Sequence, residues 1–338
     1  MDDRKKYPVL TLCPTYNQAD CIVDAMNGFA MQQTDFPVVT VIMDDASTDG
    51  NDAVIREYLQ TNFDQQEQDL AYDKDLDYGR VSFARHKTNK NCFFFVVCLK
   101  ENLYGRDDIK QSYIKEWVDG AKYVAFCEGD DYWTDPNKLQ EQVGYLETHP
   151  DSCMCTHATD WDEKGDIRLK GCRHETECDI STDEVIRKGG LYIASCSLVF
   201  RIQLMNDWPA WRKQADIWDF PIKILGTLRG KLHYFPKRMG VYRYRREGSW
   251  TDKHQVFRLD YVQNKMAWLD RLNEETNGKH ADAIYAHSYR WYRFLFVKKK
   301  ISWSEYLSYC RKSKDITKGQ VCLGIIKKSL DPCFHFQW

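Results

Sequence analysis

Tyr123-Val-Ala-Phe-Cys-Glu-Gly-Asp-Asp-Tyr-Trp-Thr-Asp-Pro136 is the stretch that decides the fold, because an apolar run stops abruptly in acidic residues. Residues 123–127 are apolar at successive positions, which is expected of a buried central strand in a parallel sheet. Asp135 directly before Pro136 is typical of a helix N-cap followed by proline in the first turn. The stretch therefore predicts a buried strand, an acidic loop and a helix that begins at Pro136.

Glu128, Asp130 and Asp131 follow the predicted strand at its carboxyl end, which is where open α/β sheets bind ligands. Three carboxylates that share a cleft repel one another and lose hydration, so a positive charge is needed to neutralise them. A Mg²⁺ or Mn²⁺ ion that arrives with a nucleotide diphosphate fits, because such ions take one or two carboxylates plus phosphate oxygens. The alternative is a solvated acidic turn that caps the helix.

The composition bounds the class of protein. The 338 residues are 43% hydrophobic and 29% charged, which suits one large or two modest globular domains. The formal net charge of -2 gives no global basic footprint, so we expect no nucleic-acid partner. Thirteen cysteines are scattered, many of them in apolar runs, which favours a reducing compartment. The cysteines and histidines of residues 153–178 match no common zinc spacing, and zinc binding there stays open.

The sequence predicts a cytoplasmic protein. No secretory signal is expected, because the basic N-terminus leads only into a short apolar stretch. The longest apolar run, residues 92–99, is too short to cross a bilayer. Residues 321–338 combine lysines with large apolar side chains, so peripheral contact with the inner face of the membrane is an alternative. Packing of this segment against the sheet domain is the favoured interpretation.

Strands and helices alternate through the N-terminal half, as the apolar periodicity shows. The expected elements are, in chain order, a strand at 9–13, a helix at 22–30, a strand at 38–43, a helix around 54–59 and a strand at 93–99. This order predicts an α/β fold with a mostly parallel sheet, right-handed crossovers and flanking helices. Residues 62–91 interrupt the alternation. A solvated surface excursion is favoured there, and pairing of residues 80–86 as a hairpin is the alternative.

The chain changes character near residue 250. Aromatic and aliphatic side chains after that point recur at helical spacing, which predicts a C-terminal helical region over 251–338. The preceding residues 1–250 would then form the catalytic sheet domain. Within them, Asp219 stands directly before Phe220-Pro221 and a helical run, so capping that helix is its structural interpretation.

Four strand ends are expected at the same edge of the sheet, and a shared edge is a shared pocket. They are residues 14–17, 44–45, 101–102 and 128–131. Tyr16 offers a ring that can stack on a base, and Asp45 offers an acceptor for a base N–H or a ribose hydroxyl. No glycine-rich phosphate loop occurs in the sequence, so a metal ion would supply the charge neutralisation that backbone N–H groups provide in such loops.

Four motifs together resemble the inverting family 2 glycosyltransferases of the GT-A fold: Pro14-Thr15-Tyr16-Asn17, Asp44-Asp45-Ala46-Ser47-Thr48-Asp49, Glu101-Asn102 and Glu128-Gly-Asp-Asp-Tyr-Trp-Thr-Asp-Pro136. Each motif alone is weak, whereas the four in this order and at this spacing are specific. The similarity covers residues 7–160 well and residues 190–250 more loosely. It implies a GT-A, Rossmann-like sheet domain with a C-terminal helical extension.

The resemblance also implies roles for single residues. The nucleotide would be contacted by Pro14, Thr15, Tyr16, Asn17, Asp45 and Asp130. Asp130 and Asp131 would form the metal motif, with Asp131 as the closer ligand of Mn²⁺ or Mg²⁺. Asp219 falls where the family places its catalytic aspartate, although Trp218 precedes it in place of an acidic residue, and Asp216 is the fallback. Arg245 replaces a histidine of many relatives, so it becomes a candidate for a diphosphate contact, and a third metal ligand stays open.

The implied activity is metal-dependent transfer of a sugar from a nucleotide-sugar donor, with a UDP-sugar favoured, to a hydroxyl of a glycan or lipid-linked acceptor. By analogy with the family, the product would belong to a bacterial surface polysaccharide or another glycan. A sugar nucleotidyltransferase is an alternative, but residues 14–20 lack the glycine-rich basic loop that such enzymes usually carry. A non-catalytic nucleotide-binding module is the other alternative, and it would need no catalytic base.

Overall fold

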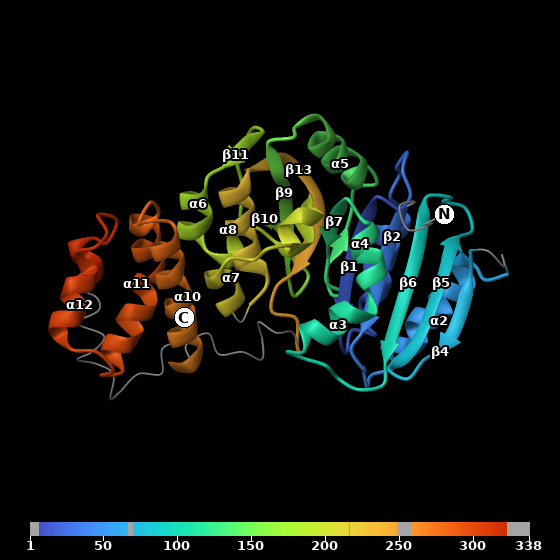
Figure 1. The fold of residues 1–338 in the computed structure, drawn as a ribbon, viewed down its shortest axis with the longest axis horizontal. Coiled ribbons are helices and arrows are strands. Elements are labelled where there is room, and N and C mark those ends of the chain that lie inside the picture. Colours follow the sequence, from blue (N-terminus) through green and yellow to red (C-terminus); the bar gives the residue numbers. More distant parts are fainter. Residues whose placement is uncertain (1–6, 67–69, 216, 249–258, 323–338) are drawn as a thin grey trace. The chain divides into compact units, whose positions relative to one another are not determined.

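The computed structural model describes residues 7–66, 70–215, 217–248 and 259–322. They form an α/β structure in which helices flank a mixed sheet with a parallel centre (Figure 1), and this confirms the predicted fold class. The central strands, in sheet order, are β7 (Tyr123–Phe126), β1 (Val9–Thr15), β2 (Val38–Asp44) and β6 (Cys92–Leu99). Neighbours among these four strands run parallel.

The register brings the carboxyl ends of the four central strands to one edge of the sheet. Thr15 at the end of β1 lies opposite Asp44 at the end of β2, and Asp44 lies opposite Cys98 of β6. On the other side of β1, Leu12 lies opposite Phe126, the last residue of β7. The loops that follow these strands therefore start close together, as the sequence analysis expected.

Helices cover both faces of this parallel centre, which explains why the strands are apolar on both sides. α1 (Ile22–Ala30), α2 (Asn51–Asn62) and α5 (Lys138–Thr148) contribute apolar side chains to the core on one face. α3 (Asp107–Tyr113) and α4 (Lys115–Gly120) adjoin the core on the other face. The strand ends are thus held on a rigid, doubly covered sheet.

Residues 63–64, 72–75 and 79–86 extend the sheet, whereas the sequence favoured a surface excursion over 62–91. β5 (Gly79–His86) pairs antiparallel with β6, and both β3 (Phe63–Asp64) and β4 (Tyr72–Asp75) pair with β5. The favoured interpretation was wrong, and the hairpin alternative is confirmed. The physical reason is the apolar and polar alternation along β5, which buries Val81 and Phe83 in the core on the face of the sheet that α3 and α4 adjoin.

Beyond β7 the sheet continues with mixed strand directions. Its strands are β12 (Val199–Arg201), β9 (Ser152–Glu163), β13 (Lys231–Arg243) and β11 (Cys178–Ile180), with β10 (Asp166–Lys170) paired to β9 and β8 (Tyr132–Trp133) paired to β13. The 3-10 turns η3 (Ser195–Ser197) and η4 (Ile202–Met205) flank β12. β13 runs through Pro236 with shifts of register, because a proline has no N–H to donate to the ladder.

One predicted helix start was wrong. α5 begins at Lys138, after Asn137, and not at Pro136. The Asp135 carboxylate does not cap the helix; its Oδ1 accepts the N–H of Asn137 at 2.8 Å. Asp135 thus closes a tight turn before the helix, which is a common alternative use of an aspartate side chain.

A second compact unit contains most of the remaining helices. It consists of residues 180–192, 207–228 and 253–338, and the first unit consists of residues 1–179, 193–206 and 229–252. The helices of the second unit are α6 (Thr182–Lys188), α7 (Ala210–Gln214), α8 (Asp219–Arg229), α10 (Leu259–Glu275), α11 (Ala281–Val297) and α12 (Trp303–Cys310), with the 3-10 turn η2 (Gly190–Tyr192). The units alternate along the chain, whereas the sequence analysis expected one boundary near residue 250. The roles expected for the two parts stay predictions.

Within the described part of the chain, no helix combines the length and the apolar character needed to cross a membrane. Two predictions fall outside the described residues. They concern Asp216, the fallback for the catalytic aspartate, and residues 323–338 of the C-terminal surface segment.

Candidate functional site

The loops after β1 and β2 are joined by hydrogen bonds between residues about thirty positions apart. The Asp45 N–H donates to the Thr15 carbonyl at 3.0 Å. The Asn17 N–H donates to Ser47 Oγ at 2.8 Å, and the Thr48 N–H donates to Asn17 Oδ1 at 2.8 Å. These contacts give Asn17 a structural role in the strand-end loops, and a direct contact of its side chain with a nucleotide stays a prediction.

Asp44 is the buried anchor of this arrangement. Asn51 Nδ2 donates to Asp44 Oδ1 at 3.0 Å and to Thr15 Oγ1 at 3.1 Å, and the Ser47 hydroxyl also donates to Asp44. Burial raises the pKa of the Asp44 carboxyl, and the bonds from Ser47 and Asn51 offset part of this rise. Asp44 therefore shapes the loop, which leaves its neighbour Asp45 as the carboxylate for a ligand.

Asp45 ties the loop after β6 to the same edge. Its Oδ1 accepts the Leu103 N–H at 2.7 Å, and Asn102 Nδ2 donates to its carbonyl at 2.9 Å. The ammonium of Lys110 on α3 lies 3.5 Å from Asp45 Oδ2. Lys110 was missed from the sequence, because no local pattern shows that this residue faces the Asp45 carboxylate.

Tyr16 and Pro14 are exposed between these anchored residues. The Tyr16 side chain is 40% exposed, whereas Thr15 is buried and donates from Oγ1 to Gln18 Oε1 at 2.7 Å. A tyrosine ring that is open to solvent is suited to stacking on a base. Thr15 has the supporting role, because its hydroxyl is already engaged within the protein.

The acidic loop after β7 lies against the end of β1. The Gly129 N–H donates to the Pro14 carbonyl at 3.1 Å, and the Asp131 N–H donates to the Glu128 carbonyl at 3.1 Å. A Cβ on Gly129 would lie 2.5 Å from Gln18 Oε1 and 2.9 Å from Thr15 Cβ. The absence of a side chain at residue 129 thus lets the acidic loop approach β1.

Replacing Gly129 by alanine should lower the stability by about 1–3 kcal/mol, the usual cost of overpacking a close contact. Gly144 is the matched control, because a Cβ there meets nothing within 4 Å and its helical position favours alanine. We expect a lower denaturation midpoint for Gly129→Ala and an unchanged or higher one for Gly144→Ala. Equal midpoints for the two variants would contradict the close approach.

Asp131 is the buried end of the acidic loop, with a side chain only 1% exposed. Its Oδ1 accepts the N–H of Arg243 at 2.8 Å, whereas its Oδ2 is buried and has no hydrogen-bond partner. Burial and then the charges of Asp130 and Glu128 raise the pKa of the Asp131 carboxyl well above its usual value. An ionised Asp131 therefore needs a positive charge at Oδ2.

Asp130 is subject to opposing influences. Burial raises the pKa of its carboxyl, and the charges of Arg246 and Arg243 only partly offset the rise. Arg243 Nη1 donates to the Asp130 carbonyl at 2.7 Å, and Arg246 Nη2 donates to the Asn17 carbonyl at 3.3 Å. These two arginines thus link the acidic loop and the loop after β1.

Arg245, the arginine chosen from the sequence, is exposed and has its guanidinium 5.1 Å from the centre of the Tyr244 ring. Its contact with a diphosphate stays a prediction. Arg243, which contacts the acidic loop, was not singled out from the sequence. The backbone explains the difference, since Arg245 has a φ of 56°, and this left-handed residue turns the chain between Arg243 and Arg246.

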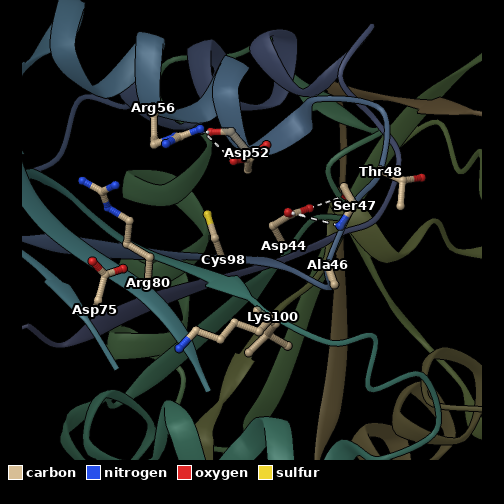
Figure 2. A pocket seen from close by; sticks show the side chains of 11 residues that line it. Asp44, Ala46, Ser47, Thr48, Asp52, Arg56, Asp75, Arg80, Cys98 and Lys100 are labelled. Atoms are coloured by element: carbon tan, nitrogen blue, oxygen red, sulfur yellow. Dashed lines mark hydrogen bonds and ion pairs between the residues drawn. The ribbon is translucent and has the colours of Figure 1, made fainter. Parts of the chain in front are cut away.

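A cavity of about 450 Å³ lies beside this edge (Figure 2), lined by the end of β2, the start of α2 and parts of β5 and β6. Its lining includes Asp44, Ser47 and Thr48, but not Tyr16, Asp45 or Asp131. Two of its cations are already paired with carboxylates, since Arg56 contacts Asp52 and Arg80 contacts Asp73. The cavity is therefore a neighbour of the predicted nucleotide residues and does not contain them.

Asp219 belongs to the second unit and is the first residue of α8, which agrees with its predicted place at a helix start. Its side chain is 37% exposed, and its Oδ2 lies 3.1 Å from the Lys223 ammonium. Burial raises the pKa of the Asp219 carboxyl, but the charges of Lys223 and Lys265 outweigh this effect and hold it below its usual value. Asp219 is therefore a carboxylate that stays ionised at neutral pH.

No cluster of three or more His, Cys, Asp or Glu side chains in the described residues has the geometry to hold a metal ion. This finding covers the described acidic loop and the Cys- and His-rich residues 153–178. One or two carboxylates, completed by phosphate oxygens and water, remain a common way of binding Mg²⁺.

Comparisons with known proteins extend these observations. No protein-family model matches the chain. Proteins described as uncharacterized in Mycobacterium tuberculosis and Mycobacterium bovis are 30% identical over 255 residues, which is 72% of this chain and 62% of each relative. The chain thus matches less than two thirds of the length of these curated relatives.

Among solved structures, residues 1–349 of Staphylococcus aureus TarS in complex with UDP-GlcNAc match 90% of this chain and 79% of that chain, with a TM-score of 0.58 and 17% identity. The same part of TarS in complex with UDP gives a TM-score of 0.55. The chain shares the fold of TarS. This fold is Rossmann-like.

Proposed function

We propose that the chain is an inverting glycosyltransferase of family 2 with the GT-A fold, which transfers a sugar from a nucleotide diphosphate to an acceptor hydroxyl. The observation that carries the proposal is Asp131, a buried carboxylate with an unpartnered Oδ2 at the strand edge where the three other predicted loops meet. The fold shared with TarS, which was solved with UDP-GlcNAc, supports the same class of reaction.

The nucleoside would bind at the loops after β1, β2 and β6. The exposed Tyr16 ring would stack on the base, and the Pro14 ring would form an apolar edge beside it. Asp45 would accept a hydrogen bond from the base or the ribose. The Lys110 ammonium, 3.5 Å from Asp45 Oδ2, helps to fix the position of this carboxylate.

The acidic loop fits a divalent cation carried with the donor. Asp131 would be the closer ligand through Oδ2, the buried atom that has no partner, and Asp130 would assist it. When bound, Mn²⁺ or Mg²⁺ would supply the positive charge that offsets the developing charge on the leaving diphosphate. The Arg243 N–H donates to Asp131 Oδ1 at 2.8 Å, which orients the carboxylate and leaves Oδ2 for the ion.

Asp219 would act as the general base. It would accept the proton of the acceptor hydroxyl while the hydroxyl oxygen forms a bond to the anomeric carbon. The bond between that carbon and the β-phosphate oxygen breaks with its electron pair on the oxygen. Attack from the face opposite the leaving group inverts the configuration. The ionised state of Asp219 suits this role, because only the carboxylate form can take up the proton.

The substrates follow from the same proposal. A UDP-sugar is the proposed donor, which the UDP and UDP-GlcNAc complexes of TarS support. A glycan or lipid-linked hydroxyl is the proposed acceptor, and bacterial surface polysaccharide assembly at the cytoplasmic side of the membrane is the proposed setting. No nucleic-acid partner is proposed, in line with the formal net charge of -2.

Thermal unfolding with UDP, UDP-GlcNAc and GDP, each with and without Mn²⁺, tests the proposal. We expect UDP compounds to raise the melting temperature in the presence of Mn²⁺ and to lose most of this effect when EDTA removes the ion. A ligand at 100 times its Kd adds about 2.7 kcal/mol to the apparent stability. No shift with any nucleotide would contradict the proposal. Release of pyrophosphate would indicate a nucleotidyltransferase, and binding without transfer or hydrolysis would indicate a binding module.

A further inference from the structure

We infer that Lys223 and Lys265 are positioning residues for Asp219: Lys223 holds the carboxylate so that Oδ1 is presented to the acceptor hydroxyl, and Lys265 packs against the next residue, Phe220. This inference rests on the proposed function, since it assumes that Asp219 is the general base. All the residues that carry it belong to the second unit. It assigns a task to α10, which lies in the region 251–338 that was predicted from the sequence only as a helical extension.

Lys223 lies one turn after Asp219 on α8, and its side chain is only 1% exposed. Its ammonium is 3.1 Å from Asp219 Oδ2 and 3.0 Å from the carbonyl of Gly190. A buried ammonium needs partners of this kind, because an unpaired charge in the interior is costly. Unlike a surface pair on a helix, this pair therefore has a fixed geometry.

The carbonyl of Gly190 ties the pair to a second element, the 3-10 turn η2. A Cβ on Gly190 would lie 3.7 Å from Asp219 Oδ2 and 3.3 Å from Phe220 Cβ. The backbone of η2 is thus close to the carboxylate and limits its movement on that side. Lys223 connects the turn and the start of α8 through a single ammonium group.

Lys265 brings a third element, α10, to the same place. Its side chain is 5% exposed, and its ammonium lies 5.0 Å from the centre of the Phe220 ring and 4.8 Å from that of Trp291. Aromatic faces stabilise a cation without neutralising it. The charge of Lys265 therefore continues to act on Asp219, the residue directly before Phe220.

Further titratable groups near this site, among the described residues, include members of α10 and α11. Tyr261 lies within reach of Lys265, while the His287 ring and the Arg290 guanidinium lie beside Gly189. Burial lowers the pKa of His287 well below its usual value, so His287 is neutral near pH 7. The lysines thus carry the main positive charge acting on Asp219, and they outweigh the effect of burial on its pKa.

The chemical consequence concerns the two oxygens of the carboxylate. An ammonium on Oδ2 fixes the orientation of the group and reduces the basicity of that atom, so Oδ1 takes the proton. The direction of the pH dependence of activity follows from the positive charges of the two lysines. With the lysines in place the Asp219 pKa is lowered, and activity persists into mildly acidic solution. Removing a lysine should raise this pKa and move the loss of activity to higher pH.

The first experiment needs no substrate. Carboxyl ¹³C NMR would follow the titration of Asp219 in the unmodified protein and in Lys223→Met, with Asp219→Asn used to assign the signal. We expect the Asp219 pKa to rise by about one unit or more in Lys223→Met, as is typical when an aspartate loses an adjacent cation. Lys265→Met should give a smaller rise. Lys279→Met is the matched control, because Lys279 is exposed in the same unit.

The second experiment measures transfer or hydrolysis of UDP-GlcNAc, as a probe donor, against pH. The acid limb of kcat/KM should move to higher pH in Lys223→Met, and Lys223→Arg should restore part of the original profile. In an Asp219→Asn background, Lys223→Met should cause no further loss of rate, because Lys223 acts through Asp219. Additive losses of rate in the double variant would show that Lys223 has a purely structural role and would overturn the inference.

The outcomes separate this inference from the proposed function. Unchanged turnover in Asp219→Asn would remove Asp219 as the base, whatever the lysines do. Loss of turnover in Asp219→Asn together with an unshifted Asp219 pKa in both lysine variants would overturn the positioning role alone. If Lys223→Met does not fold, as its melting curve would show, the decision passes to Lys265→Met, and an unshifted pKa there would overturn the inference.

Discussion

Asp219→Asn should lower turnover by about 10²–10⁴-fold, the range that a general base contributes. Asparagine keeps the size of the side chain and its place at the first residue of α8, but it cannot take up the proton of the acceptor hydroxyl. Donor binding should stay nearly unchanged, because the proposed donor contacts come from other residues. The measurement is kcat for transfer together with the Kd of the nucleotide.

Glu274→Gln is the matched control for this variant. Glu274 is on α10 in the same unit, its side chain is 69% exposed, and its ion pair with Arg271 is at the surface. This control should leave both turnover and nucleotide affinity unchanged. A normal kcat in Asp219→Asn would exclude Asp219 as the base. A loss of both kcat and nucleotide affinity would show that the residue supports the structure of the donor site.

Asp131→Asn should abolish most of the effect of Mn²⁺ on nucleotide binding. The change removes the charge at Oδ2, the buried atom that we propose as a metal ligand. A loss of affinity of at least about 10- to 100-fold is expected, since even the partners of metal ligands typically contribute that much. Binding without Mn²⁺ should change little. The measurement is the Kd of UDP with Mn²⁺ and with EDTA.

The same substitution should not destabilise the metal-free protein. The pKa of Asp131 is raised in the folded state by burial, Asp130 and Glu128, so its ionisation at neutral pH opposes folding. This unfavourable contribution to the free energy of folding increases as the pH rises above the pKa of an unfolded aspartate. A neutral asparagine relieves it, and we expect an equal or higher melting temperature in EDTA. Function and stability should therefore change in opposite directions, as is common at binding sites.

Asp77→Asn is the control for charge removal at an exposed position of the first unit. It should alter neither the melting temperature nor the dependence on Mn²⁺. A fully retained Mn²⁺ effect in Asp131→Asn would contradict the metal assignment. A strongly lowered melting temperature in EDTA would show instead that Asp131 is a structural carboxylate whose buried oxygen has a stabilising partner.

Several features were predictable because they are written in local sequence patterns. The strands that became β1, β2, β6 and β7 are continuous apolar runs, and such runs are what a doubly covered parallel sheet selects. The error at residues 62–91 also has a local cause. Polar, glutamine-rich residues between short strands look like a loop, whereas the pairing of β5 with β6 is a contact between separate segments.

In the candidate site, too, local patterns predicted the residues, whereas contacts between separate segments set their environments. Asp44 and Asp45 are adjacent and chemically identical, yet Asp44 is enclosed by Ser47 and Asn51 while Asp45 meets Leu103 and Lys110. The residue types alone do not distinguish these two environments. The difference arises because successive residues at a strand end point to opposite sides of the sheet.

The sequence by itself determined the parallel centre of the sheet, the acidic loop after the strand at 123–126 and the meeting of the strand ends at one edge. These features were predictable because apolar runs and the polar residues that end them are local properties of the sequence. Only the tertiary structure decided that Arg243 contacts that loop, that Arg246 contacts the loop after β1, and that Asp131 keeps a buried oxygen without a partner. The Arg243 to Asp131 bond joins residues 112 positions apart. Packing of distant segments sets such contacts, and no local pattern encodes them.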